Sequence, residues 1–149
     1  MRCVVQRVSR AHVSVDGIIV GSIGAGFVAL VGAEAGDTLS DMRYCADKII
    51  GLRVFDDDAG KMNLSIKEAG GAILLISQFT LMGDARHGRR PSFSRAARPE
   101  DAEPMLNQMA EYIAAAGIAV ESGRFQAHMA VELVNDGPVT ILLDSKKTF

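Results

Sequence analysis

The stretch 72-AILLISQFTL-81 indicates both the fold and the candidate site. Its first half is apolar in succession, which is typical of a buried strand. From Ser77 onward the side chains become hydroxyls and an amide, and a loop that contains Arg89 and Arg90 follows. A rigid strand that ends in polar groups delivers them to a pocket. The pattern therefore predicts a central strand over residues 73–80 with a pocket beside it, and the arginines indicate an anionic partner.

The segments around this strand show the periods of further strands and of two helices. Asp16-Gly17 is a strong hairpin turn between two such strands. Thr38 offers a capping side chain for the first helix, and acidic residues at the start of the second suit the helix dipole. The predicted strands cover residues 1–9, 11–15, 18–21, 27–33, 53–55, 73–80, 118–121, 129–134 and 139–144, and the predicted helices cover 38–52 and 99–116.

Each predicted helix has one apolar face, at a spacing of three and four residues. The order of strands and helices predicts one compact α/β domain over residues 1–149, with a mostly antiparallel or mixed sheet. The predicted buried residues are Met42, Cys45, Ile49 and Leu52 in the first helix, and Met105, Met109, Tyr112 and Ile113 in the second.

Composition and charge restrict the class of protein. The chain has 149 residues, of which 48% are hydrophobic and 23% charged, as in ordinary globular domains. No stretch approaches the roughly 20 apolar residues of a membrane span, and the N-terminus lacks the pattern of a signal peptide. We therefore expect a cytoplasmic protein that binds no membrane, with Cys3 and Cys45 as free packing residues. A net charge of −2 argues against nonspecific coating of duplex DNA.

A basic cluster lies in the second half of this slightly acidic chain. Between residues 86 and 98 there are five arginines, one histidine and no acid. Arginine presents a fork of donors that matches phosphate oxygens, which favours contact with phosphate or RNA. A solvated loop is the alternative interpretation. The cluster consists of Arg86, His87, Arg89, Arg90, Arg95 and Arg98.

Several common site patterns are excluded. The glycines of residues 21–26 have the wrong spacing for a dinucleotide-binding turn, and the three histidines have no partners at metal spacing. We therefore expect neither a metal ion nor a cofactor. Ser77 and Thr80 carry hydroxyls that can act as nucleophiles, but the sequence names no base to activate them. A structural role for this segment stays open.

A second unusual stretch is 135-NDGPVT-140. A Gly-Pro pair between two strands is usually only a turn. Glycine before proline also leaves a backbone without a Cβ, which suits close approach to a ligand, and a cis bond here would be a deliberate feature. The sequence leaves both interpretations open.

These motifs resemble those of the D-aminoacyl-tRNA deacylase family, and the likeness extends over nearly the whole chain. The Ser-Gln-Phe-Thr motif at 77–80 and the Asn-Asp-Gly-Pro-Val-Thr motif at 135–140 are together highly specific. The chain departs from the family's common residues at Met82, His87 and Gln126, outside both motifs, so these departures concern the fine-tuning of substrate choice. The likeness also covers residues 1–8, 15–17, 61–65 and 88–93.

The resemblance implies a barrel-like fold and a homodimer with two active sites at its interface. Gly137 and Pro138 would reach into each pocket from the partner subunit, where their backbone would collide with an L side chain but not with a D side chain. Glycine has no side chain to exclude, so some cleavage of mischarged glycyl-tRNA is expected. The residues implied at the site are Ser77, Gln78, Phe79 and Thr80 as catalytic residues. With tRNA as the substrate, the basic cluster supplies Arg86, Arg89 and Arg90 as the expected tRNA-binding residues.

The implied reaction is chiral proofreading, in which the ester between a D-amino acid and the terminal adenosine of tRNA is hydrolysed. Either Thr80 is the nucleophile, or backbone donors and the 2′-hydroxyl of the tRNA assist a water molecule. The missing base favours the second mechanism. Phe79 is a candidate wall for the adenine. A noncatalytic RNA-binding module and an ordinary serine or threonine esterase are the rival functions.

Overall fold

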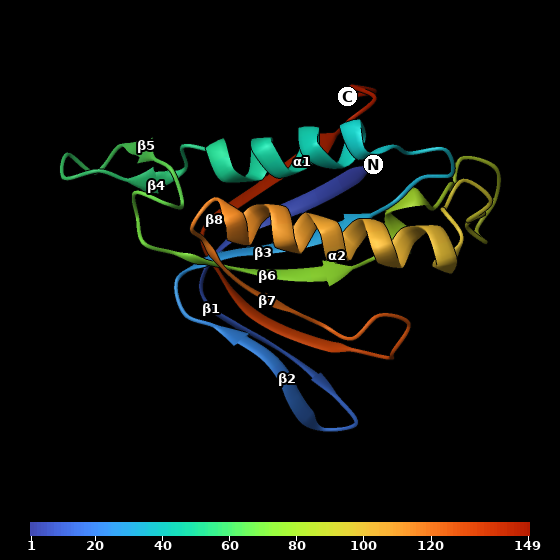
Figure 1. Cartoon of the computed structure of the whole chain (residues 1–149), viewed down its shortest axis with the longest axis horizontal. Helices are drawn as coiled ribbons and strands as arrows, with labels where there is room; N and C mark the ends of the chain where they lie inside the picture. The colour runs from blue at the N-terminus through green and yellow to red at the C-terminus, as the bar shows by residue number, and fades with distance from the viewer.

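The computed structural model describes residues 1–149 and consists of strands and two long helices (Figure 1). The β-strands are β1 (Arg2–Val15), β2 (Ile18–Ile23), β3 (Gly26–Gly32), β4 (Phe55–Asp56), β5 (Met62–Leu64), β6 (Ala72–Ser77), β7 (Ala119–Ser122) and β8 (Ala130–Asp144). The helices are α1 (Leu39–Gly51), the short 3₁₀ helix η1 (Phe79–Met82) and α2 (Pro99–Ala115).

The main sheet is mixed, as the sequence predicts. Its strand order is β2-β1-β3-β6-β7, and β8 pairs with β1. The β1 pairs are antiparallel, whereas β3–β6 and β6–β7 are parallel. The sheet curls until β2 approaches β7. Gly21 of β2 lies so close to Ser122 of β7 that an added Cβ would be 2.8 Å from the Ser122 carbonyl oxygen. The result is a nearly closed barrel, which confirms the barrel-like expectation.

Both long helices cover the same side of the sheet (Figure 1). The larger core lies between them and the strands, and it contains Phe27, Ile73 and Met109 with no exposed surface. A smaller core fills the part of the barrel that the helices do not cover. Tyr112 was predicted to lie on the buried face of α2, and this prediction is wrong. This side chain is 37% exposed, because its hydroxyl reaches out to donate a hydrogen bond to Asp47 at 2.8 Å.

The two ends of the chain are joined beside the start of α1. The buried amine of Met1 contacts a carboxylate oxygen of Asp37 at 2.7 Å and donates to Ser145 Oγ at 2.8 Å. The Lys146 ammonium bonds Asp41 at 2.9 Å. Burial alone would raise the pKa of Asp41, but hydrogen bonds from Lys146 and from the backbone N–H of Thr38 outweigh it and hold the pKa of this carboxyl well below its usual range.

Three predicted strand boundaries in the main sheet are wrong; outside it, the strand expected over residues 53–55 is β4 at 55–56, and β5 was not predicted. The two strands expected over residues 1–15 are one strand, β1, and the two expected over 129–144 are one strand, β8. The third error is at the end of β6, which stops at Ser77 rather than Thr80. Sequence patterns missed the two continuous strands because each carries polar residues at an irregular pairing, which interrupts the alternation of apolar side chains without ending the strand.

The helices are each too short or too polar to cross a bilayer. Cys3 and Cys45 are free and buried, as expected of packing residues.

Candidate functional site

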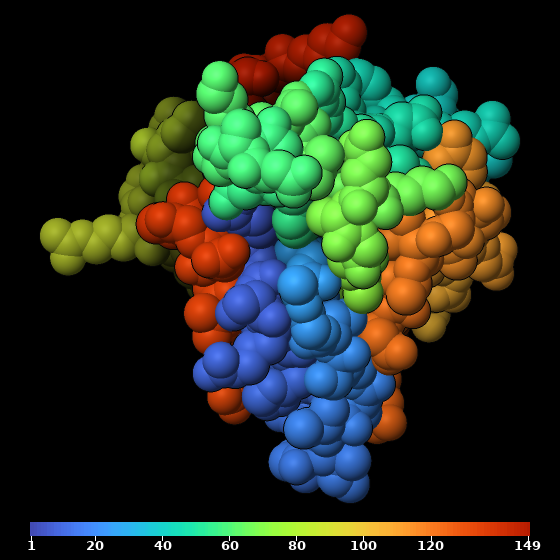
Figure 2. Space-filling view, turned by 90° about the vertical axis from the view of Figure 1, so that its left-hand side faces the viewer, coloured from blue at the N-terminus to red at the C-terminus, as the bar shows by residue number.

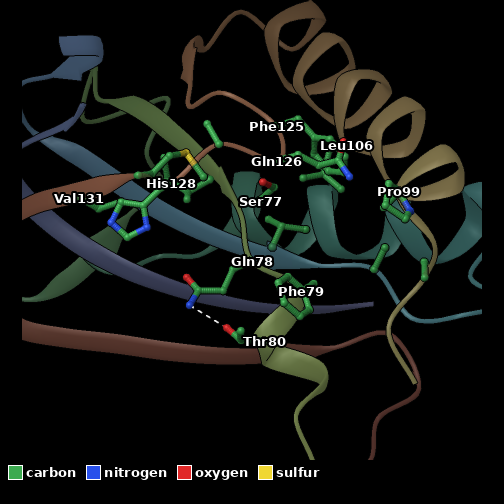
Figure 3. Close-up of a pocket in the computed structure, with 17 residues that line it drawn as sticks. Ser77, Gln78, Phe79, Thr80, Pro99, Leu106, Phe125, Gln126, His128 and Val131 are labelled. Atoms are coloured by element: carbon green, nitrogen blue, oxygen red, sulfur yellow. Dashed lines mark hydrogen bonds between the residues drawn. The ribbon is translucent and has the colours of Figure 1, made fainter. Parts of the chain in front are cut away.

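A mostly apolar cavity of about 600 Å³ opens where β6 ends (Figure 3). The ends of β3 and β6, the 3₁₀ helix η1, the start of α2, and the loop between β7 and β8 with the first residues of β8 form its walls. The lining residues are Val31, Ala33, Ile76, Ser77, Gln78, Phe79, Thr80, Ala97, Pro99, Ala102, Leu106, Phe125, Gln126, Ala127, His128, Met129 and Val131.

The four residues of the Ser-Gln-Phe-Thr motif all lie at this cavity. The last backbone bond that guides β6 runs from the Gln78 N–H to the Val31 carbonyl at 2.7 Å. The chain then turns into η1, so Ser77 and Thr80 do not continue along one strand and both contribute to the same wall. Residues three apart on one strand face opposite ways, so the early end of β6 is what allows both side chains to line the same cavity.

The Thr80 hydroxyl has one hydrogen-bond partner within the chain. It accepts from the side-chain amide of Gln78 at 3.0 Å (Figure 3). No histidine, lysine or carboxylate bonds it, so the structure offers no base that would take its proton. Phe79 is 57% exposed and packs edge-on against Phe93, with ring centroids 5.2 Å apart. Its ring therefore forms part of an open, aromatic rim.

The far wall of the cavity was missed by sequence reasoning. It consists of residues 125–129 and the first turns of α2, which have neither a catalytic pattern nor a strong turn signal. Only the unusual residue at position 126 marked this loop in the sequence. The wall forms only in the folded chain, where α2 and the loop before β8 both meet the end of β6 (Figure 3).

Gly137 and Pro138 do not line the cavity of their own chain. Both are exposed on β8 and are joined by a cis bond. Gly137 and Pro138 lie opposite Arg7 of β1, and Arg7 pairs with Phe27 at the start of β3. Ser77, at the cavity, pairs instead with Val31 near the end of β3. The Gly-Pro segment and Ser77 are therefore separated by four residues along β3, about 13 Å at 3.3 Å per residue. Figure 2 shows this orange-red part of β8 uncovered, beside the blue of β1.

The Gly-Pro segment is a bulge in the β1–β8 ladder. Gln6 pairs with Thr140 and Val8 with Asn135, so residues 136–139 of β8 face the single residue between them on β1. The Asn135 side chain spans the bulge, because its oxygen accepts from the Val139 N–H at 3.2 Å and its amide donates to Thr140 Oγ1 at 3.1 Å. The polar residues of the second motif therefore fix the shape of the bulge.

Arg7 supports the bulge from beneath, a role that sequence analysis did not assign. Its side chain is almost completely buried and donates to the carbonyls of Val54 at 2.6 Å and Asp136 at 3.1 Å. A Cβ added to Gly137 would lie 3.2 Å from the Arg7 guanidinium and 2.8 Å from the Val139 side chain. Because Gly137 also has a φ of +127°, a larger residue there is both crowded and strained.

The basic cluster divides into paired and unpaired arginines. Arg86 forms an ion pair with Asp84 at 2.5 Å, and its hydrogen bonds hold the pKa of that carboxyl well below its usual range. Arg95 is paired with Glu34. Arg89 and Arg90 are exposed and make no ion pair within the chain. The structure thus leaves these two guanidiniums free for an anionic partner.

Comparison with known proteins gives the family. The family model described as D-Tyr-tRNA(Tyr) deacylase matches residues 4–144. The chain belongs to this family. It is 62% identical over 149 residues to the D-aminoacyl-tRNA deacylase of Symbiobacterium thermophilum, a match that covers all of this chain and 99% of the relative. It is 56% identical to the D-aminoacyl-tRNA deacylase of a Thermoanaerobacter strain over the full length of both chains.

Two solved structures have the same fold. A protein described as the c-Myc DNA unwinding element binding protein superposes with a TM-score of 0.91 at 38% identity, covering 97% of this deacylase-family chain and 98% of its own. A probable eukaryotic D-amino acid tRNA deacylase superposes with a TM-score of 0.78, covering 96% and 98%. Its identity is 17%, so it supports the fold alone.

Proposed function

We propose that this protein hydrolyses the ester of D-aminoacyl-tRNA and releases the D-amino acid and tRNA. Membership of the deacylase family makes the chain an enzyme of this class. One observation supports the location of the reaction: all four residues of the Ser-Gln-Phe-Thr motif line one cavity at the end of a buried strand. Since charged aminoacyl-tRNA is made where translation occurs, we expect the enzyme to act in the cytoplasm.

The proposed mechanism uses water rather than Thr80 as the nucleophile. The Thr80 hydroxyl is bonded only to the Gln78 amide, which cannot accept its proton. The first N–H groups of η1, at Phe79 and Thr80, have no partner within that helix and are available to a developing oxyanion. The 2′-hydroxyl of the terminal ribose lies next to the ester in the substrate and would assist the water. No metal ion or cofactor is needed for these steps.

The proposed active site is shared between two copies of the chain. The Gly137-Pro138 backbone is exposed about four strand residues away from its own cavity, so it is available to a second copy. β8 pairs only with β1, which leaves its other edge free. Val134 and Leu142 on this strand are 39% and 57% exposed, an apolar surface that a two-fold dimer would bury.

In such a dimer the Gly-Pro backbone would stand beside the bound amino acid. A D side chain would point away from this backbone, and an L side chain would collide with it. Glycine has no side chain, so the proposal includes slow cleavage of glycyl-tRNA. Arg89 and Arg90, with no acidic partner of their own, are the proposed contacts to the tRNA backbone, and Arg86 joins them only if it leaves Asp84.

Release of amino acid from matched D- and L-tyrosyl-tRNA tests this proposal. We expect hydrolysis of the D substrate and a rate for the L substrate close to that of spontaneous hydrolysis. If neither ester is cleaved although the tRNA binds, the protein is an RNA-binding module. Fast cleavage of simple D-tyrosine esters that lack a ribose would instead support an ordinary esterase with a Thr80 nucleophile.

A further inference from the structure

Gln126 has a backbone conformation that a residue with a side chain rarely adopts. Its φ is +59°, and it occupies the third position of a turn closed by the Ala127 N–H and the Arg124 carbonyl at 3.2 Å. Glycine is the residue that this position favours, because it has no Cβ to collide with the backbone. Backbone strain of this kind clusters at functional sites, so the Gln126 side chain is a candidate for a role in the cavity.

The Gln126 side chain is an unused polar group at the cavity. It is exposed, it lines the wall formed by the loop before β8, and its amide makes no hydrogen bond within the chain. Figure 3 shows it without a bonded neighbour, in contrast to the Gln78–Thr80 pair. An amide offers one donor group and one acceptor, so it can form two hydrogen bonds to a planar ligand edge.

The surroundings of Gln126 favour a flat, apolar ring. Figure 3 shows Phe125, Gln126 and Leu106 together on the α2 side of the cavity, away from Gln78 and Thr80. Phe125 offers a ring face or edge, and α2 supplies aliphatic contacts. Aromatic side chains stack on nucleobases, and a glutamine amide pairs with the N6 amine and N7 of adenine.

We propose that Gln126 is a specificity-determining residue that hydrogen-bonds the adenine of the terminal adenosine. The inference rests on the proposed function, which places the ester against Gln78 and Thr80. The ribose joins the ester to the base, so a base that extends from this point along the cavity meets the Phe125–Gln126 wall. The amino acid is the less suitable occupant of that wall, because the proposed Gly-Pro screen requires it at the opposite side of the ester.

Pairing a change in the enzyme with a change in the base tests this inference. The substrates are D-tyrosyl-tRNA with its normal terminal adenosine, and the same tRNA ending in purine riboside, which lacks the N6 amine. The variants are Gln126→Gly, which removes the amide and relaxes the turn, and Gln126→Asn, which keeps an amide but shortens its reach. Gln108→Ala, an exposed glutamine of α2 outside the cavity, is the matched control.

For the wild type and Gln108→Ala, we expect kcat/KM to be roughly tenfold or more higher with adenosine than with purine riboside. Gln126→Gly should reduce this preference to about twofold or less through a loss on the adenosine substrate, and Gln126→Asn should also lose most of it. The melting temperature of Gln126→Gly should not fall, because glycine suits the turn.

Two results would overturn the inference while the proposed function stands. One is an equal loss on both substrates in Gln126→Gly, and the other is an unchanged preference for adenosine. Absence of D-tyrosyl-tRNA hydrolysis by the wild type would overturn the proposed function, and the inference with it.

Discussion

Replacement of Thr80 by alanine should leave most of the activity intact. The substitution removes one hydroxyl, whose only partner in the chain is the Gln78 amide at 3.0 Å. A neutral hydrogen bond contributes about 0.5–1.5 kcal/mol. At 1.36 kcal/mol per tenfold change in rate, its loss lowers kcat/KM by about 2- to 13-fold. Removal of a true nucleophile would cost far more, because the covalent intermediate on the Thr80 oxygen could no longer form.

Single-turnover release of D-tyrosine from D-tyrosyl-tRNA measures this effect without interference from product release. Thr148→Ala, which removes a threonine hydroxyl outside the cavity, is the matched control and should retain the wild-type rate. A loss of about 10⁴-fold or more for Thr80→Ala with normal folding, together with an acyl-enzyme detected by mass spectrometry in the wild type, would refute the water mechanism.

Three further predictions concern chirality, tRNA binding and stability. Gly137→Ala should lower the D-over-L ratio of kcat/KM or abolish activity, because a Cβ is strained at a φ of +127° and would lie 2.8 Å from the Val139 side chain. Parallel assays of both esters measure the ratio, and an unchanged ratio would exclude the Gly-Pro screen. Replacing Arg89 and Arg90 by alanine should raise KM and flatten the slope of log kcat/KM against log salt by about 1.4 units, at about 0.7 per lost phosphate contact, and an unchanged slope would exclude contact with the backbone. Asp41→Asn should lower the free energy of unfolding by about 1 kcal/mol at pH 7, through loss of the Lys146 pair and of the helix cap. Because folding lowers the pKa of this carboxyl, its stabilisation is fully present above about pH 4 and is lost only as the pH falls through the lowered pKa. Denaturant titrations should therefore show the difference between variant and wild type shrinking steadily as the pH falls below about 4.

The elements that follow a clear period could be predicted from the sequence. The apolar run of β6, the capped start of α1 at Thr38 and the proline at the start of α2 all lie where the pattern placed them. The boundary of β6 was wrong because nothing local distinguishes Ser77 from the next three residues. The strand ends there because the chain turns into η1 directly after its last bond to β3, from the Gln78 N–H to the Val31 carbonyl.

The parts of the site that depend on long-range pairing could not be predicted. The β1–β8 bulge exists because Arg7 and residues 136–139 meet across about 130 residues of chain, and local patterns carry no record of that pairing. The far wall of the cavity has the same origin. The two motifs, in contrast, were visible as breaks between apolar runs, since polar residues that follow a buried strand are exceptional on physical grounds.

The central claim is that each active site combines the Ser77–Thr80 cavity of one chain with the Gly137-Pro138 backbone of another. Mixing two variants, Gln78→Ala and Gly137→Ala, tests it most directly, with the D-tyrosyl-tRNA hydrolysis of each unmixed variant as the baseline for recovery. In a mixed dimer one site inherits both defects and the other inherits neither. After complete random exchange, half of the dimers are mixed and half of their sites are intact, so the shared-site account predicts recovery of about a quarter of wild-type D-tyrosyl-tRNA hydrolysis. No recovery after exchange has been demonstrated by mass spectrometry would mean that each site is built within one chain, and would contradict the account.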